Sequence, residues 1–416
     1  MKERCDYMER WCLGGMLMLL LLLTACASEP TEEPIGSDEK PVIKLYLFAP
    51  NNPIVTRTDE GYVDATEDEN RIKTIDVWVF EKVNSNPRLV TYTHVDDLIF
   101  DAGSGQKEIT MEVSKEFAER STLPRVDIYV VANVTSTNCG LSFDRNTSPT
   151  ELEAALIEHK SEGDFFGLTG LTSLTNPIMS VPDGGLPMSG FQKNQQVTGS
   201  APVFSVNKNN VKLVRAVSKV RFIFSFSKAI PASNPPTISD LTVTLNDGML
   251  PKQEYLFLNE LYDYPKVANQ SNIPTGVEYE GGDLISIEGN VNINDCVDPA
   301  AYAFDGTTET GQSYEDRINN GLTTQTGQTD PDLSELGRFY LRESDKQLKG
   351  TINYKVNGVQ KTTPLPSFSM ASAGDFTRNH TWIVYGYFLG SGELKLNVVD
   401  VKDWNSDDDM GKTYNW

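Results

Sequence analysis

The sequence predicts an all-β fold built as two β-sandwich domains in tandem. A length of 416 residues exceeds one small domain and suits two domains of about 150–200 residues each. The 31 glycines, 22 prolines and 16 tyrosines favour strands and turns over helices. Several short segments alternate apolar and polar residues and are separated by turn residues, with almost no helical pattern between them. Regular short strands of this kind are typical of β-sandwiches.

The first 25 residues predict a signal peptide. Residues 13–23 are uniformly apolar but too few to span a hydrocarbon core of about 30 Å, which needs about 20 residues. Leu23-Thr-Ala-Cys26 follows directly and has the pattern of a bacterial lipobox, so Cys26 is the predicted lipidation site. The alternative is an ordinary secreted protein with a chance cysteine. Residues 26–41 are polar and acidic and read as a flexible linker.

The first predicted strand covers residues 42–49. Its alternation places Ile43, Leu45, Leu47 and Ala49 on one face. Residues 51–70 are polar and acidic, and we interpret them as an exposed loop whose carboxylates are solvated rather than bound to calcium.

Further strands and one short helix follow. Ser148-Pro-Thr-Glu151 is a capping box, which predicts a helix from Pro149 to about Lys160. Residues 163–199 and 264–337 are expected to be mostly loop. The predicted strands are 75–80, 125–132, 211–226, 241–245, 340–341, 351–356, 382–389 and 394–401, the last two joined by a turn at 390–392.

Composition and motifs exclude several functions. A net charge of −22 and a pI near 4.6 argue against nucleic-acid binding, and no motif of a hydrolase, nucleotide-binding protein or metalloprotease is present. We therefore expect no enzyme activity, no cofactor and no metal. His94, His159 and His380 are expected to form no common site, and Cys139 and Cys296 are interpreted as free thiols rather than a disulfide. Trp78, Trp382 and Trp404 are assigned to the core rather than to a carbohydrate platform.

Several motifs, in order, resemble the fimbrillin family, the major fimbrial subunits of type V pili in Bacteroidales. The resemblance covers most of residues 20–416. The motifs are the lipobox at Cys26, the strands 75–80 and 126–133, Leu186-Pro-Met-Ser-Gly190, Leu213-Val-Arg-Ala-Val-Ser-Lys-Val220, 339–343, 376–382, 399–404 and Trp416.

The resemblance implies a surface-exported lipoprotein precursor with two transthyretin-like sandwiches. In this family a trypsin-like protease removes the first strand, and a strand from a neighbouring subunit replaces it. Arg57 is the only basic residue between Lys44 and Arg71, so the implied cleavage lies between Arg57 and Thr58. The implied segments are the signal peptide 1–25, the linker 26–41, the removable strand and cleavage loop 42–57, and the domains 58–205 and 206–416.

The implied partners are other pilus subunits, the outer membrane through the lipid, and a host or bacterial surface receptor. Two features depart from the family. The first 25 residues carry as many acidic as basic side chains, and residues 405–416 are hydrophilic for a donor strand. A tip or anchor subunit that does not polymerise, or a surface glycan-binding lipoprotein, therefore remains the alternative.

Overall fold

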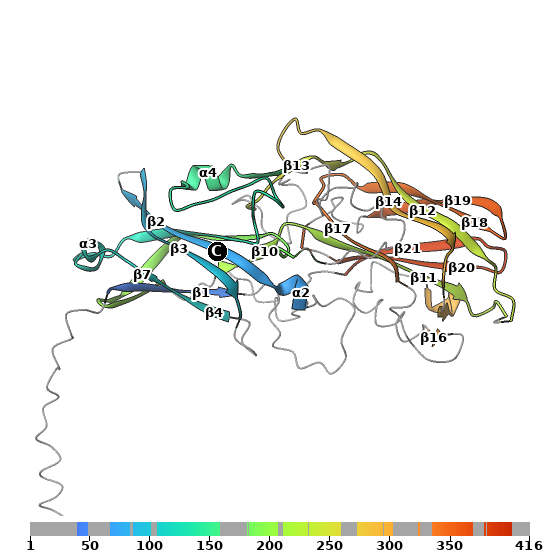
Figure 1. Cartoon of the computed structure of the whole chain (residues 1–416), viewed down its shortest axis with the longest axis horizontal. Helices are drawn as coiled ribbons and strands as arrows, with labels where there is room; N and C mark the ends of the chain where they lie inside the picture. The colour runs from blue at the N-terminus through green and yellow to red at the C-terminus, as the bar shows by residue number, and fades with distance from the viewer. Residues whose placement is uncertain are drawn as a thin grey trace, which may run out of the picture.

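The computed structural model describes residues 40–48, 67–83, 86–100, 106–158, 181, 183–206, 211–231, 233–258, 273–293, 295–302, 323–324, 335–368, 378–379 and 381–401. These residues form two β-domains that follow one another along the long axis of the molecule (Figure 1). The predicted fold class, all-β with two sandwiches in tandem, is confirmed.

The first domain is built on a nine-stranded sheet with the order β3-β2-β5-β7-β8-β1-β4, to which β9 and β10 add short pairings. Its elements are β1 (Val42–Phe48), α2 (Glu67–Asn70), β2 (Ile72–Val83), β3 (Asn86–Leu98), β4 (Gln106–Glu112), α3 (Lys115–Ala118), β5 (Arg125–Ala132), α4 (Pro149–Glu153), β6 (Leu156–Glu158), β7 (Met188–Ser200), β8 (Val203–Val206), β9 (Val211–Lys212) and β10 (Val214–Arg215). One end of β7 pairs with β5 and the other with β8, so the long strand joins the two halves of the sheet. Both halves contribute to one apolar core.

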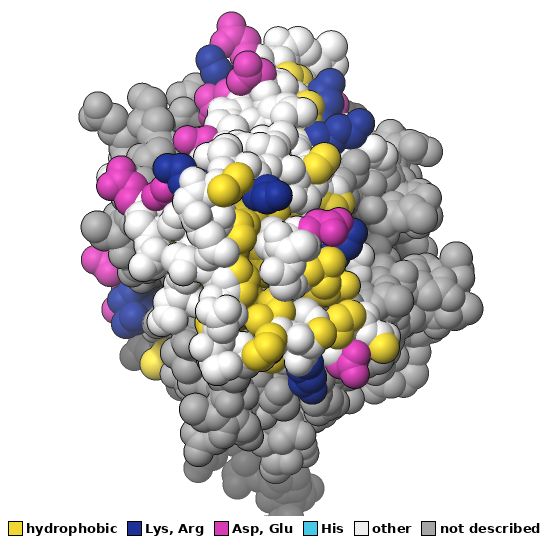
Figure 2. All heavy atoms as spheres, turned by 90° about the vertical axis from the view of Figure 1, so that its right-hand side faces the viewer, with side chains coloured by type: hydrophobic (Ala, Val, Ile, Leu, Met, Phe, Trp, Pro, Cys, Tyr) yellow, Lys and Arg dark blue, Asp and Glu magenta, His cyan; other side chains and the backbone are white. Residues whose placement is uncertain are grey.

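The second domain packs a six-stranded sheet, with the order β16-β15-β11-β20-β21 and β17 beside β11, against a four-stranded sheet with the order β14-β12-β18-β19. Its elements are β11 (Ser218–Ser227), β12 (Ile238–Pro251), β13 (Gln253–Tyr255), β14 (Tyr279–Asn290), β15 (Asp295–Val297), the 3₁₀-helix η2 (Pro299–Tyr302), β16 (Thr323–Thr324), β17 (Glu335–Leu341), β18 (Leu348–Val356), β19 (Val359–Phe368), β20 (Thr381–Phe388) and β21 (Leu394–Val401). Figure 2 looks at the far end of this domain, where apolar side chains are interspersed with acidic and basic ones.

The strand β2 is buried on both faces, although its sequence alternates. Trp78 is fully buried because Tyr92 and Phe143 cover it, with ring centroids at 5.3 and 6.0 Å. Its indole nitrogen donates a hydrogen bond to the carbonyl oxygen of Asp144 at 2.9 Å. Trp382 is also buried, so the assignment of these two tryptophans to the core is confirmed, whereas Trp404 lies outside the described residues.

Four strands of ten or more residues, β3, β7, β14 and β19, were not predicted, and two of them lie in segments expected to be mostly loop. β7 lies within the segment expected to be mostly loop, and β14 lies within the loop-rich segment 264–337. Both contain glycines and polar residues, which disfavour strands locally. Their neighbours supply the hydrogen bonds, β5 and β8 for β7 and β12 for β14, so tertiary pairing overrides the local preference.

The predicted capping box is present at the start of α4. The Ser148 hydroxyl accepts a hydrogen bond from the amide of Glu151, and the Glu151 carboxylate accepts one from the amide of Ser148. The helix is shorter than predicted and ends at Glu153. The chain turns there because residues 156–158 form β6, which pairs with β13 of the second domain.

The chain crosses from the first domain to the second in the segment that joins Arg215, the end of β10, to Ser218, the start of β11. β8, β9 and β10 still pair with strands of the first domain, whereas β11 begins the second. This transition lies about ten residues beyond the boundary at 205 that the family resemblance implied. Cys139 and Cys296 form no disulfide with each other, as interpreted from the sequence.

His94 on β3 is held by two carboxylates. Its Nδ1 lies 2.8 Å from Asp76 and its Nε2 lies 3.2 Å from Asp96. The hydrogen bond with Asp76 is the main cause that raises the pKa of His94 above 6.5. His159 and His380 lie outside the described residues.

We expect the Asp76→Asn variant to lower the pKa of His94, as measured by NMR titration of the imidazole signals. Because the folded-state pKa exceeds the unfolded one, this pair stabilises the protein fully below pH 6.5, and the stabilisation is lost as the pH rises through the folded-state pKa. An unchanged titration midpoint in the Asp76→Asn variant would show that the hydrogen bond does not control the histidine.

Candidate functional site

The first strand, β1, is paired along both of its edges. It runs antiparallel to β4 over its whole length, from Val42 opposite Glu112 to Phe48 opposite Gln106. Its other edge runs parallel to β8 near its start and to β9 near its end. β1 therefore fills a slot inside the sheet, and its removal would leave unpaired backbone groups on two walls.

The inner face of β1 belongs to the core of the first domain. Ile43, Leu45 and Leu47 are 0%, 2% and 0% exposed, which confirms the predicted alternation for these three. Met111 and Ile109 of β4 lie opposite Ile43 and Leu45 and are both buried. Ala49, the fourth predicted member of this face, lies outside the described residues.

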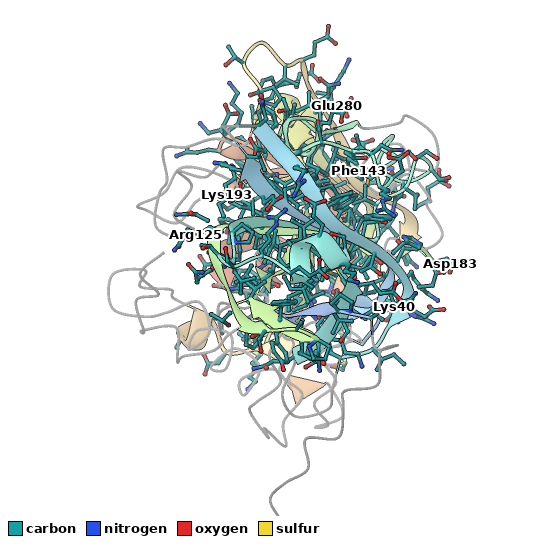
Figure 3. All side chains as sticks on the ribbon, turned by 90° about the vertical axis from the view of Figure 1, so that its left-hand side faces the viewer. Lys40, Arg125, Phe143, Asp183, Lys193 and Glu280 are labelled. Carbon is teal, nitrogen blue, oxygen red and sulfur yellow. The ribbon has the colours of Figure 1, made fainter. Side chains whose placement is uncertain are left out.

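The outer face of β1 is bound to β4 by polar contacts. The ammonium of Lys44 lies 2.7 Å from one carboxylate oxygen of Glu108, and the hydroxyl of Tyr46 donates to the other oxygen at 2.7 Å. Lys40, just before the strand, pairs with Glu112 at 2.9 Å. Figure 3 shows Lys40 beside β1 at the margin of the first domain.

These contacts shift the pKa values of the groups that make them. The hydrogen bonds from Lys44 and Tyr46 lower the pKa of Glu108. The hydrogen bond with Glu108 and its charge raise the pKa of Lys44, and the same two effects raise the pKa of Tyr46. All three shifts stabilise the charge pattern seen, with a carboxylate between an ammonium and a neutral phenol.

The predicted processing and lipidation sites lie outside the described residues. Arg57 and Thr58 fall in the segment 49–66, and Cys26 falls in the segment 1–39. The helix α2 begins at Glu67, ten residues beyond Arg57 in the chain.

The interface between the domains holds a buried ionic cluster that sequence reasoning missed. The prediction that Glu69 of α2 is solvated like the rest of the acidic loop is wrong, because its side chain is fully buried. Its carboxylate pairs with Lys219 at 3.0 Å and accepts a hydrogen bond from the hydroxyl of Tyr340 at 2.5 Å. Both partners belong to the second domain. Burial, opposed by Glu69, lowers the pKa of Lys219 to about 8.

Arg215 lies beside this pair and extends the cluster. Its guanidinium donates to the backbone carbonyl of Glu69, to the side chain of Asn70 and to the side chain of Asn379. The backbone amide of Asn379 donates to the backbone carbonyl of Val217 at 2.8 Å. α2 therefore contacts Arg215 in its own domain and Lys219 and Tyr340 in the second domain.

Arg378 organises the other part of the interface. Its guanidinium pairs with Glu343 at 2.6 Å and donates to the backbone carbonyls of Leu256 and Tyr255 at 3.0 and 2.7 Å. Glu254 lies 3.5 Å away and is fully buried. Burial is the main cause that raises the pKa of Glu254, and Arg378 opposes it.

The only hint of this cluster in the sequence is the segment Leu213–Val220, where Arg215 and Lys219 interrupt an apolar strand. A charged side chain at a buried position requires a buried partner. The sequence alone does not identify the partners, because they are far away in the chain. Asn379 is 164 positions from Arg215, and Glu69 is 150 positions from Lys219.

The described part of the chain shows no metal centre and no membrane span. None of its His, Cys, Asp and Glu side chains form a group of three that could hold a metal ion. No helix among these residues is long and apolar enough to cross a membrane.

Residues 46–221 match the family described as major fimbrial subunit protein (FimA). A search of curated proteins finds no match. Among solved structures, the chain is similar to a fimbrilin (FimA) from Porphyromonas gingivalis W83, with 11% identity, a TM-score of 0.43, and coverage of 87% of this chain and 97% of that chain. It is also similar to the tip fimbrial protein Mfa3 from Porphyromonas gingivalis (12%, TM-score 0.41, 87% and 99%) and to a fimbrial assembly protein from Parabacteroides distasonis ATCC 8503 (13%, TM-score 0.38, 87% and 96%).

Proposed function

We propose that the chain, whose residues 46–221 match the major fimbrial subunit family, is a structural and adhesive pilus subunit assembled by strand exchange. In this proposal the chain is exported as a lipoprotein anchored through Cys26 to the outer membrane. A trypsin-like protease then cuts between Arg57 and Thr58. β1 leaves the sheet, and a strand from another subunit takes its place at the cell surface.

The position of β1 between two walls is the observation that carries this proposal. A strand at the edge of a sheet could leave and expose only one row of backbone groups. Removal of β1 instead separates β4 from β8 and β9 and uncovers the pockets of three buried side chains. An extended segment from another chain restores both the hydrogen bonds and the apolar contacts, which is the principle of β-augmentation.

Arg57 gives the sharpest test of processing. We expect mild trypsin treatment of the folded protein to cut after Arg57 before most other sites, and the Arg57→Ala variant to resist this cut and to fail in cut-dependent polymerisation. Amino-terminal sequencing and gel filtration of the products measure both effects. The matched control is Arg71→Ala, which alters the next basic residue along the chain and should be cut and assembled normally.

An intact 57–58 bond after trypsin treatment would contradict this role for Arg57. Normal assembly of the Arg57→Ala variant would do the same. Either result would favour the alternatives of an anchor subunit that keeps its first strand or a surface glycan-binding lipoprotein.

A further inference from the structure

Glu108 contacts two side chains of the strand that fills the slot. Each of its carboxylate oxygens contacts a different residue of β1: Oε1 contacts Lys44 and Oε2 contacts Tyr46, both at 2.7 Å. Residues two apart on a strand share a face and are separated by roughly 6.6–6.8 Å along it. Glu108 lies directly opposite Tyr46 in the register, so Lys44 and Tyr46 converge on it from the same face.

Among the residues that the structure describes, the strand positions paired with Lys44 carry no charge. The residue paired with Lys44 on β8 is Ser205, and the residue paired with it on β4 is Thr110. The hydroxyl of Thr110 itself donates to Glu108 at 3.4 Å. The carboxylate of Glu108 is therefore the charged group that meets the outer face of an incoming strand at this level.

We propose that Glu108 is a specificity-determining residue of the slot and selects a strand that carries lysine and tyrosine two positions apart on its outward face. This inference rests on the strand exchange proposed above and names the chemistry of the strand that is accepted. An acidic side chain at the position of Lys44, which is diagonal to Glu108 across the two strands, would bring two like charges together, and such a pair is destabilising.

The sequence contains this outward pattern twice. Lys44-Leu-Tyr46-Leu-Phe48 and Lys412-Thr-Tyr414-Asn-Trp416 both place lysine, tyrosine and a large aromatic residue at alternate positions. None of the other lysines in the sequence is followed two positions later by tyrosine. The intervening residues differ, because Leu45 and Leu47 correspond to Thr413 and Asn415. A second copy of residues 410–416 thus matches the outer face of the slot and fits its apolar inner face less well.

Peptide binding to the processed protein tests the selection. The full chain is cut with trypsin, the released strand is removed, and dissociation constants are measured by fluorescence anisotropy with labelled peptides of residues 42–48 and 410–416. Because the contacts are partly exposed, we expect Lys44→Glu to weaken the first peptide about tenfold and Tyr46→Phe about threefold. Lys412→Glu should weaken the second peptide by a similar factor.

The Glu108→Lys protein should reverse the preference and bind the Lys44→Glu peptide more tightly than the unaltered one. The control is Glu119→Lys, which makes the same charge change on an exposed residue that makes no contact with β1. If the unaltered and Lys44→Glu peptides bind equally well to the unaltered protein and to the Glu108→Lys protein, the proposed selection by Glu108 is wrong, whereas strand exchange is not contradicted. Failure of the unaltered peptide of residues 42–48 to bind at all would overturn both proposals.

The uncut chain provides a second measurement. Lys44→Glu and Glu108→Lys should each lower the midpoint of urea unfolding, and the double variant should recover most of the loss. Additive effects of the two changes would show that the pair does not interact and would overturn the proposal.

Discussion

A chain that starts at Thr58 is expected to lose most of the stability of its first domain. It lacks Ile43, Leu45 and Leu47, and burying a large aliphatic side chain contributes about 1.5–3 kcal/mol. The sum of about 5–9 kcal/mol is an upper bound, because unfolded chains already bury some apolar surface. It is comparable with the whole free energy of unfolding of a typical domain, about 5–15 kcal/mol.

Urea unfolding followed by tryptophan fluorescence measures this loss, because Trp78 lies in the affected core. A chain that starts at Lys40 keeps β1 and is the matched control. Addition of a peptide of residues 42–48 should restore the transition of the shortened chain toward that of the control. Equal unfolding midpoints for the two chains would show that β1 does not hold the first domain together.

The Lys219→Met variant is expected to lose about 3–5 kcal/mol of unfolding free energy, because removing one partner of a buried ion pair leaves the other charge without compensation. Here that charge is Glu69, whose side chain is 0% exposed. Thermal or urea unfolding measures the loss. Lys228→Met, on an exposed residue just beyond the same strand, is the control and should change stability little.

The pH dependence of this variant provides an independent check. The pKa of Lys219 is about 8 in the folded protein against 10.5 for an ordinary lysine, so the unfolded chain binds more protons at this group between these two values. The unaltered protein should therefore gain stability relative to Lys219→Met as the pH rises from about 8 to 10.5. A constant difference across this range would mean that Lys219 titrates normally.

Local patterns in the sequence were sufficient to predict elements that depend on residues close together in the chain. The alternation of Ile43, Leu45 and Leu47 predicted both the strand and its buried face, and the spacing of Ser148 and Glu151 predicted the start of α4. Each of these signals lies within a few residues, where side-chain period and capping chemistry decide the structure. The predicted roles of Cys26 and Arg57 stay predictions.

Long-range features could not be predicted in the same way. Glu69 belongs to a run of acidic residues, and nothing near it in the sequence distinguishes it from its solvated neighbours. Its burial depends on Lys219 and Tyr340, which are 150 and 271 positions away. Likewise, the slot around β1 is defined by strands that follow it by more than 50 residues, so its two walls appear only when the chain is folded.

The small sheet formed by β6 and β13 has a mechanical consequence. One of its strands comes from each domain, with Leu156, Ile157 and Glu158 paired to Tyr255, Glu254 and Gln253. Glu69 of the first domain also pairs with Lys219 of the second, and both side chains are buried. A tensile force that separates the domains must therefore break a strand ladder and a buried ion pair together. We expect a fibre of such subunits to yield first at the joints between subunits, while each subunit moves as a single rigid link.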